Sequence, residues 1–147
     1  LDLSQPVYVE GESPKIGKVA LPLALVEHMR RAPVVEVRAT AEARLAFLLR
    51  DYAYLGDDAQ GLSLKLGYLK ELQGRERVER WQAWAQEGTL PPLFDELMRL
   101  HYDPQYERSQ SKHFVQWGPR QVVESADLTQ RGIDALALQI AALPAVA

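Results

Sequence analysis

The chain has 147 residues, of which 47% are apolar and 25% are charged, and these values are ordinary for one globular domain with a core. It contains no cysteine, which excludes disulfides, cysteine–zinc sites and thiol nucleophiles within these residues. The net charge of −3 excludes a surface that is positively charged overall, so contact with a polyanion requires a local cluster of arginine and lysine.

Two further features of the composition limit the class of protein. No apolar run reaches the roughly 20 residues that a membrane-spanning helix needs. The histidines His28, His101 and His113 are scattered without metal-ligand spacing, which argues against a zinc site.

Leu1 stands where an initiator methionine is expected, so we expect the chain to be a piece of a longer protein.

The first third of the chain predicts two strands around a helix. Residues 6–10, PVYVE, are β-branched and aromatic and favour a strand, and the Gly/Pro/Ser-rich residues 11–20 favour a loop. Residues 21–31 have apolar positions at helical spacing. Residues 33–39, PVVEVRA, favour a second strand. This order predicts a βαβ unit whose two strands pair in parallel.

The rest of the chain predicts mainly helices, followed by two strands and a last helix. Thr40 is a predicted N-cap, and Thr129 is placed to begin the last helix. The helical segments are predicted at 41–55, 59–87 with glycine interruptions, 89–110 with a break at Asp103–Pro104, and 130–143, and the strands at 112–118 and 121–127. We therefore predict an α/β fold, a small parallel sheet with a helical insertion at about residues 40–110, within one domain spanning residues 1–147.

A charged loop follows the first predicted strand. Glu10 and Glu12 lie two residues apart, and Ser13 and Lys15 add a hydroxyl and a cation. A carboxylate at the carboxyl end of a parallel strand is where α/β proteins place ligand chemistry, including Mg²⁺ bound to phosphate. The alternative is a solvated surface turn.

Two arginines flank the start of the helix predicted at 41–55. Arg38 and Arg44 could each bind an anion through two parallel N–H···O hydrogen bonds. The alternative is surface ion pairing at helical spacing.

An unusual concentration of polar and aromatic residues occurs at 101–112, HYDPQYERSQSK. Aromatic side chains can stack on bases, while Arg108 and Lys112 can meet phosphates. The alternative is a helix terminus capped by Asp103 with half-buried tyrosines. The stretch RERVERWQAW is more simply a solvated helix face with Trp81 and Trp84 turned to the core. No phosphate-binding GxxxxGK[ST] loop is present in these residues.

The order of these motifs resembles the bacterial tRNA 2-selenouridine synthases, in the segment that follows their P-loop. The resemblance covers roughly residues 6–125, and the short motifs are specific through their order and spacing. The matching positions are Glu10, Glu12, Ser13, Ile16, Gly17, Glu42, Arg44, Leu45, Asp51, Tyr52, Tyr102, Asp103, Pro104 and Tyr106.

The resemblance implies a transferase that converts 2-thiouridine at the tRNA wobble position to 2-selenouridine. It implies S-geranylation from geranyl diphosphate and selenation from selenophosphate, in a cytoplasmic enzyme with an N-terminal rhodanese domain and a P-loop. The catalytic cysteine, the rhodanese domain and the P-loop are missing from this chain. We therefore expect it to be the C-terminal part of the P-loop domain, inactive alone, with the rest of the enzyme and the anticodon region of tRNA as its partners.

The resemblance also assigns expected roles to the candidate residues. Phosphate or substrate binding is expected at Glu10, Glu12, Ser13, Lys15, Arg38 and Arg44, with Glu10 as the residue that would hold Mg²⁺. Contact with tRNA or the prenyl group is expected at Tyr52, His101, Tyr102, Asp103, Tyr106 and Arg108. The alternative functions are a helical protein-interaction or regulatory domain and a fragment of another P-loop kinase.

Overall fold

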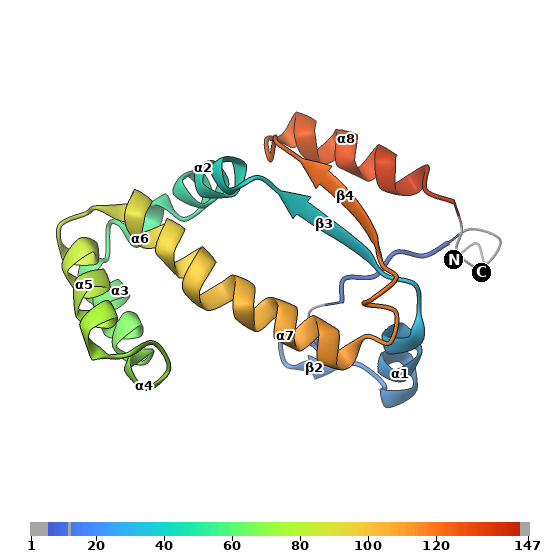
Figure 1. Cartoon of the computed structure of the whole chain (residues 1–147), viewed down its shortest axis with the longest axis horizontal. Helices are drawn as coiled ribbons and strands as arrows, with labels where there is room; N and C mark the ends of the chain where they lie inside the picture. Colours follow the sequence, from blue (N-terminus) through green and yellow to red (C-terminus); the bar gives the residue numbers. More distant parts are fainter. Residues whose placement is uncertain (1–5, 12, 145–147) are drawn as a thin grey trace.

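The computed structural model describes residues 6–11 and 13–144, which form an α/β part and a helical part (Figure 1). The α/β part contains β1 (Lys15–Ile16), β2 (Val19–Ala20), α1 (Leu23–Arg31), β3 (Val35–Ala39), β4 (Gln121–Ser125) and α8 (Gln130–Ala141). The helical part contains α2 (Ala41–Asp51), a 3₁₀ turn (Ala53–Leu55), α3 (Ala59–Gly67), α4 (Lys70–Gln73), α5 (Arg75–Gln86), α6 (Leu90–Leu97), a π-helical turn (Met98–Tyr102) and α7 (Asp103–His113). Helix α7 runs from the helical part back to the α/β part.

The central sheet consists of β3 and β4, which pair in parallel from Val35 opposite Gln121 to Ala39 opposite Ser125. All the helices of the helical part lie between these two strands in the chain. The predicted α/β fold, with a small parallel sheet and a helical insertion between strands, is therefore confirmed. Helix α8 follows β4 and packs on it.

Both predicted helix N-caps are present. The Thr40 hydroxyl accepts a hydrogen bond from the Ala43 amide at 3.2 Å, and the Thr129 hydroxyl accepts one from the Gly132 amide at 3.4 Å. These bonds satisfy amide groups that have no partner within the first turn of a helix. Short-range capping chemistry therefore fixed the start of α2 and of α8.

The prediction of a strand at residues 6–10 is wrong for the structure described. These residues form no ladder, although the Tyr8 hydroxyl donates to the Ile140 carbonyl at 2.9 Å. The predicted βαβ unit is wrong for the same reason, because β3 takes its parallel partner from β4. A strand exists only where a second strand accepts its hydrogen bonds, and β-propensity alone cannot supply one.

Three other local predictions are wrong. The break predicted at Asp103–Pro104 is absent, because the π-helical turn at Met98–Tyr102 continues directly into α7, whose first turn accommodates the proline. Residues 11–20 contain the short β1–β2 hairpin, whose turn uses Gly17 at φ 59°. Residues 112–118 form no strand because α7 continues to His113. The Phe114 amide still bonds to the Gln110 carbonyl at 2.9 Å, and the Val115 amide bonds to the Arg30 carbonyl at 2.9 Å.

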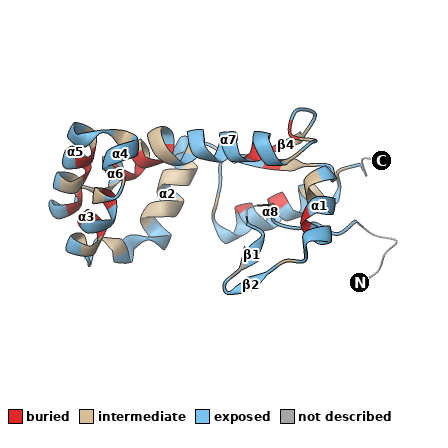
Figure 2. Ribbon diagram, turned by 90° about the horizontal axis from the view of Figure 1, so that it is seen from below, coloured by how far each residue is buried: buried red, intermediate tan, exposed pale blue. Residues whose placement is uncertain are grey.

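The helical part has its own core, visible as the buried band in Figure 2. Its buried members are Leu62, Leu66, Val78, Trp81, Ala85, Leu93, Phe94 and Leu97. Trp81 is fully buried, as predicted, and its indole N–H donates to Glu96 at 2.8 Å, while Trp84 packs at the edge. Of the described helices, none combines the length and the apolar character required to cross a membrane.

Candidate functional site

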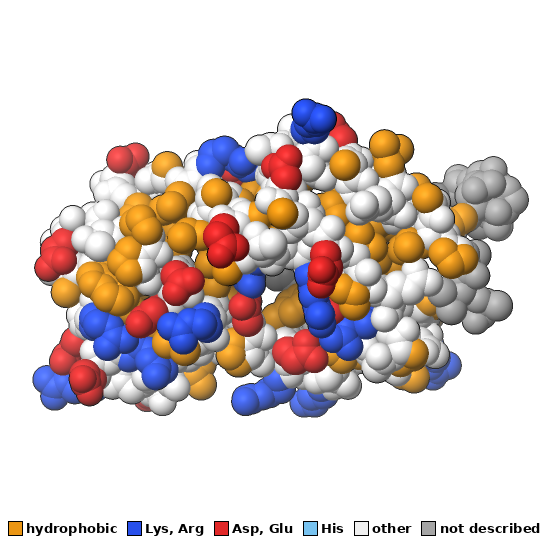
Figure 3. Space-filling model, turned by 45° about the horizontal axis from the view of Figure 1, so that its top comes forward, with side chains coloured by type: hydrophobic (Ala, Val, Ile, Leu, Met, Phe, Trp, Pro, Cys, Tyr) orange, Lys and Arg blue, Asp and Glu red, His pale blue; other side chains and the backbone are white. Residues whose placement is uncertain are grey.

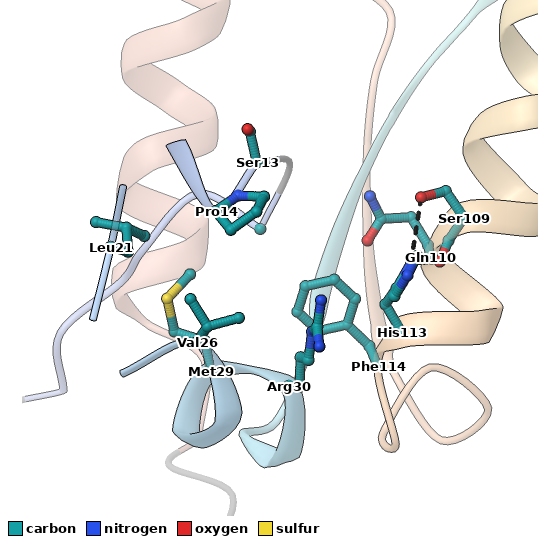
Figure 4. A pocket seen from close by; sticks show the side chains of 11 residues that line it. Ser13, Pro14, Leu21, Val26, Met29, Arg30, Ser109, Gln110, His113 and Phe114 are labelled. Atoms are coloured by element: carbon teal, nitrogen blue, oxygen red, sulfur yellow. Dashed lines mark hydrogen bonds between the residues drawn. The ribbon is translucent and has the colours of Figure 1, made fainter. Parts of the chain in front are cut away.

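A pocket of about 300 Å³ lies where the charged loop meets α1 and the end of α7 (Figure 4). Two parts of the chain that are distant in sequence line it. The first part contributes Gly11, Ser13, Pro14, Leu21, Val26, Met29 and Arg30, and the second contributes Ser109, Gln110, His113 and Phe114. One part of the lining is apolar and another carries a cation, hydroxyl groups and an imidazole. A pocket of this size and mixed chemistry suits a small amphiphilic ligand.

The pocket depends on close contact between the charged loop and α7. A Cβ atom added at Gly11 would lie 2.9 Å from the Phe114 ring, which is closer than real Cβ contacts. Glycine therefore lets the backbone of the loop rest on the aromatic ring. The bond from the Val115 amide to the Arg30 carbonyl joins the end of α1 to the segment after α7.

Arg30 supplies the positive charge of the pocket. Its side chain is half-buried on the face of α1 that also carries Val26 and Met29. Within residues 6–11 and 13–144, the structure gives the Arg30 guanidinium no ion pair and no hydrogen bond. A half-buried guanidinium without an anion can bind a phosphate or carboxylate through paired N–H groups.

Polar groups beside Arg30 leave further donors for an anion. The His113 Nδ1 donates to the Ser109 carbonyl at 2.8 Å, so Nε2 is an acceptor in the neutral ring and a donor only in the imidazolium form. The Ser13 hydroxyl oxygen accepts from the Lys15 amide at 3.1 Å, so its own proton remains available to a ligand. The Ser13 hydroxyl, and His113 in its imidazolium form, can therefore join the guanidinium around one bound anion.

Arg38 belongs to a separate network on the sheet. Glu36 is buried and accepts hydrogen bonds or ion pairs from Arg120 at 2.7 Å and from Arg38 at 2.9 Å. Burial alone would raise the pKa of Glu36, but the bonds from the two guanidinium groups outweigh it and lower the pKa below the ordinary value. Arg120 also donates to the Trp117 carbonyl at 2.7 Å and lies 4.2 Å from the Trp117 ring centroid.

Arg44 joins α2 to the start of α7. Its two terminal nitrogens donate to the two carboxylate oxygens of Asp103 at 2.9 and 2.5 Å. The hydrogen bond to Asp103 raises the pKa of Arg44, so the Arg44 guanidinium is fully charged at any physiological pH. Arg44 and Asp103, which were assigned to different binding roles, are thus paired with each other.

His101 lies in the π-helical turn beside this pair, and such turns are frequent at functional sites. Its Nδ1 faces the side-chain amides of Gln73 at 3.3 Å and Gln105 at 3.2 Å, and burial lowers the pKa of His101. Because the amide groups can donate to Nδ1, the neutral imidazole with its proton on Nε2 fits this site. The Tyr102 ring packs edge-on against His101 at 5.0 Å and remains 62% exposed.

Residues 2–67 match the family described as the tRNA 2-selenouridine synthase AAA domain. The chain is also 27% identical over 151 residues to a curated tRNA 2-selenouridine synthase of Marinobacter nauticus, covering 82% of this chain and 41% of that protein. The predicted family resemblance is confirmed. The chain spans about two fifths of the length of this relative, and no solved structure matches it significantly.

The segment that matches the synthase family contributes most of the pocket. The charged loop, α1 and β3 lie within residues 2–67, whereas Ser109, His113 and Phe114 come from the end of α7. Ser13 is the predicted site residue that lines the pocket. Glu10 and Lys15 are exposed nearby in the chain, and Glu12 lies outside the described residues.

The remaining predicted residues of the synthase motifs lie along α2 and α7. Tyr52 is exposed and contacts the Tyr54 ring at 6.0 Å, Tyr106 packs edge-on against Trp117 at 6.1 Å, and Arg108 is exposed. The structure thus separates the predicted residues: Ser13 lines the pocket, Arg38 belongs to the Glu36 network, and Arg44 and Asp103 bind each other. Glu10, Lys15, Tyr52 and Arg108 are exposed outside these three places. Basic and acidic side chains are interspersed on the face shown in Figure 3.

A magnesium site at Glu10 stays a prediction. Within the described part of the chain, no group of three or more His, Cys, Asp or Glu residues is placed to hold a metal ion. A single carboxylate fits Mg²⁺ where substrate phosphates supply further oxygen ligands.

Sequence reasoning missed Arg30, Ser109, His113 and Phe114. Arg30 lies at the C-terminal end of the helix predicted at residues 21–31, where a cation is favourable without any ligand, and His113 falls within the strand predicted at 112–118. The signal that could have found Arg30 is its place one turn after Val26, on the helix that directly follows the charged loop. No comparable signal in the sequence indicates that the end of α7 returns to this loop.

Proposed function

We propose that the chain is a segment of an enzyme that replaces sulfur by selenium in 2-thiouridine of tRNA, and that its pocket binds the diphosphate substrate. In this proposal the complete cytoplasmic enzyme forms an S-geranylated intermediate from geranyl diphosphate and then uses selenophosphate. The segment binds substrate and the chain outside residues 1–147 supplies the catalytic groups.

The observation that carries the proposal is the half-buried Arg30 without an ion pair among the described residues, in a pocket with an apolar side. Geranyl diphosphate has an anionic head and a hydrocarbon tail. The head fits Arg30, Ser13 and the imidazolium form of His113, and the tail fits the side lined by Leu21, Val26, Met29 and Phe114.

Contact with tRNA is proposed for the exposed aromatic and basic residues near the π-helical turn and along α7. Tyr52, Tyr102 and Arg108 present rings or charge to solvent, as RNA-binding surfaces do. His101, Asp103 and Tyr106 support this surface through their own contacts in this proposal.

The test is geranyl diphosphate binding to the complete protein, measured by isothermal titration calorimetry. Arg30→Ala should weaken binding at least about tenfold, because a hydrogen bond to a charged group contributes about 1.5–3 kcal/mol. The matched control is Arg31→Ala, which removes an exposed guanidinium from the same helix end outside the pocket lining. Equal affinities for both variants would refute the assignment.

A further inference from the structure

Exposed cations adjoin the segments that line the pocket. Lys15 in β1, Arg31 in α1, and Arg108 and Lys112 in α7 are all exposed. Each of them directly precedes or follows a pocket-lining residue in the chain. Since each is exposed while its neighbour lines the pocket, these four residues, the rim cations, lie around the pocket opening.

The rim cations have no acidic partner within residues 6–11 and 13–144, where the structure gives them neither an ion pair nor a side-chain hydrogen bond. Ion pairs do hold six arginines elsewhere in the chain, namely Arg38, Arg44, Arg50, Arg75, Arg80 and Arg120. Glu10 and Glu27 are the described carboxylates that also adjoin lining residues. Together with Arg30, the rim cations outnumber them, although the whole chain has a net charge of −3.

Helix α7 connects the rim cations with exposed aromatic rings. Tyr102, directly before α7, is 62% exposed, and Tyr106, one turn later, is 48% exposed. Figure 1 shows α7 running from the helical part to the end of α1, and its 11 residues span about 16 Å. Aromatic rings together with cations along one path are typical of surfaces that bind single-stranded nucleic acid.

We propose that the rim cations bind the phosphate backbone of tRNA and thereby bring the nucleotide to be modified to the pocket opening. This rests on the proposed function, because it takes the geranyl diphosphate held at Arg30 as the second reactant. In S-geranylation the thiouridine sulfur forms a bond to the geranyl carbon, and the bond from that carbon to a diphosphate oxygen breaks. The diphosphate leaves with the bonding electrons, and a ring nitrogen of the base releases its proton to water. The sulfur must therefore reach the pocket, which brings the neighbouring tRNA phosphates to its opening.

Two features favour RNA over an acidic protein as the partner of the rim cations. A protein interface of ordinary stability has a desolvated apolar centre, whereas the rim cations come from three elements around an open pocket. A polynucleotide can bind spaced cations without such a centre, because its phosphates are themselves spaced along the strand.

The first test is binding of a fluorescein-labelled anticodon stem-loop of tRNA to the complete protein, measured by fluorescence anisotropy between about 50 and about 200 mM salt. The double variant Arg31→Gln/Lys112→Gln should weaken binding at least about tenfold at the lower salt concentration. It should also lower the slope of log K against log salt concentration by about 1.4–1.8, because each phosphate contact contributes about 0.7–0.9 to that slope.

The matched control is Lys65→Gln/Arg131→Gln. It removes an exposed lysine of α3 and an exposed arginine of α8, neither of which adjoins a pocket-lining residue. This control should keep the affinity and the salt slope of the parent protein. Equal losses in the two double variants, or an unchanged salt slope in Arg31→Gln/Lys112→Gln, would overturn the proposal.

Binding of inorganic pyrophosphate to the same variants separates this proposal from the diphosphate assignment. Arg31→Gln/Lys112→Gln should keep the pyrophosphate affinity of the parent within about twofold, because exposed charges outside the pocket are screened by salt. Equal losses of RNA and pyrophosphate affinity in this variant would place its cations in the diphosphate site and would overturn the proposal. Failure of Arg30→Ala to weaken geranyl diphosphate binding would instead refute the proposed function, and the RNA readouts do not depend on that measurement.

The second test locates the nucleotide by photocrosslinking. A stem-loop that carries 4-thiouridine at the wobble position is irradiated with near-ultraviolet light on the complete protein, and the crosslinked peptides are identified by mass spectrometry. We expect peptides from α1 or from the end of α7, with a lower yield for Arg31→Gln/Lys112→Gln. Crosslinks confined to α3, α4 and α5, or to the chain outside residues 1–147, would overturn the proposal.

Discussion

Replacement of Glu36 by alanine tests the network that joins the sheet to the segment after α7. Removing one partner of a buried ion pair costs about 3–5 kcal/mol. The lower end of this energy range applies here. Without Glu36, the Arg38 side chain, which is 48% exposed, can be hydrated, and Arg120 still donates a hydrogen bond to the Trp117 carbonyl at 2.7 Å. We therefore expect a loss of about 3 kcal/mol at pH 7, equivalent to roughly 6–12 °C in melting temperature.

The assay is thermal unfolding of Glu36→Ala and of the parent protein between pH 3 and pH 7. The pKa of Glu36 is lowered in the folded state, so its stabilisation is present above the unfolded value of 4.5 and is lost as pH falls through the folded pKa. The difference between the two proteins should therefore shrink as the pH falls below 4.5. Glu79→Ala, which removes an exposed i,i+4 pair with Arg75, is the control and should leave the melting temperature unchanged. A variant as stable as the parent at pH 7 would refute this reasoning.

Two further predictions concern the pocket and the helical part. Gly11→Ala places a methyl group 2.9 Å from the Phe114 ring and should cost about 1 kcal/mol in stability and weaken diphosphate binding. Gly118→Ala is the control, because the new Cβ has open space around it, and it should change neither the stability nor diphosphate binding. Equal effects of the two substitutions in thermal unfolding would contradict the close contact between Gly11 and the Phe114 ring. A double-mutant cycle on Arg44 and Asp103 should give a coupling of about 1 kcal/mol that falls in high salt, since both side chains are partly exposed. A coupling near zero at low salt would show that this pair does not join α2 to α7.

The parts of the fold that could be predicted from the sequence are those set by local chemistry. The β-branched residues of β3 and β4 and the threonine caps of α2 and α8 carry their own signals within a few residues. The pairing of β3 with β4 is not local, because the whole helical part separates the two strands. The sequence indicated a parallel sheet but assigned β3 the wrong partner.

The candidate site was predicted in part for the same reason. The charged loop was recognised, and Ser13 does line the pocket. The cation and the imidazole of the pocket come from α1 and the end of α7, and only the folded chain brings them to the loop. Arg44 and Asp103 carried a family motif, yet their spacing gave no indication that they bind each other.

The central claim is that Arg30 is the guanidinium that receives the anion. The most direct measurement is NMR of the arginine side-chain Nε–H groups in the complete protein during titration with inorganic pyrophosphate. The Arg30 signal should shift and saturate, while the signal of Arg44, which already binds Asp103, should stay in place. A saturable shift at Arg44 with none at Arg30 would contradict the account.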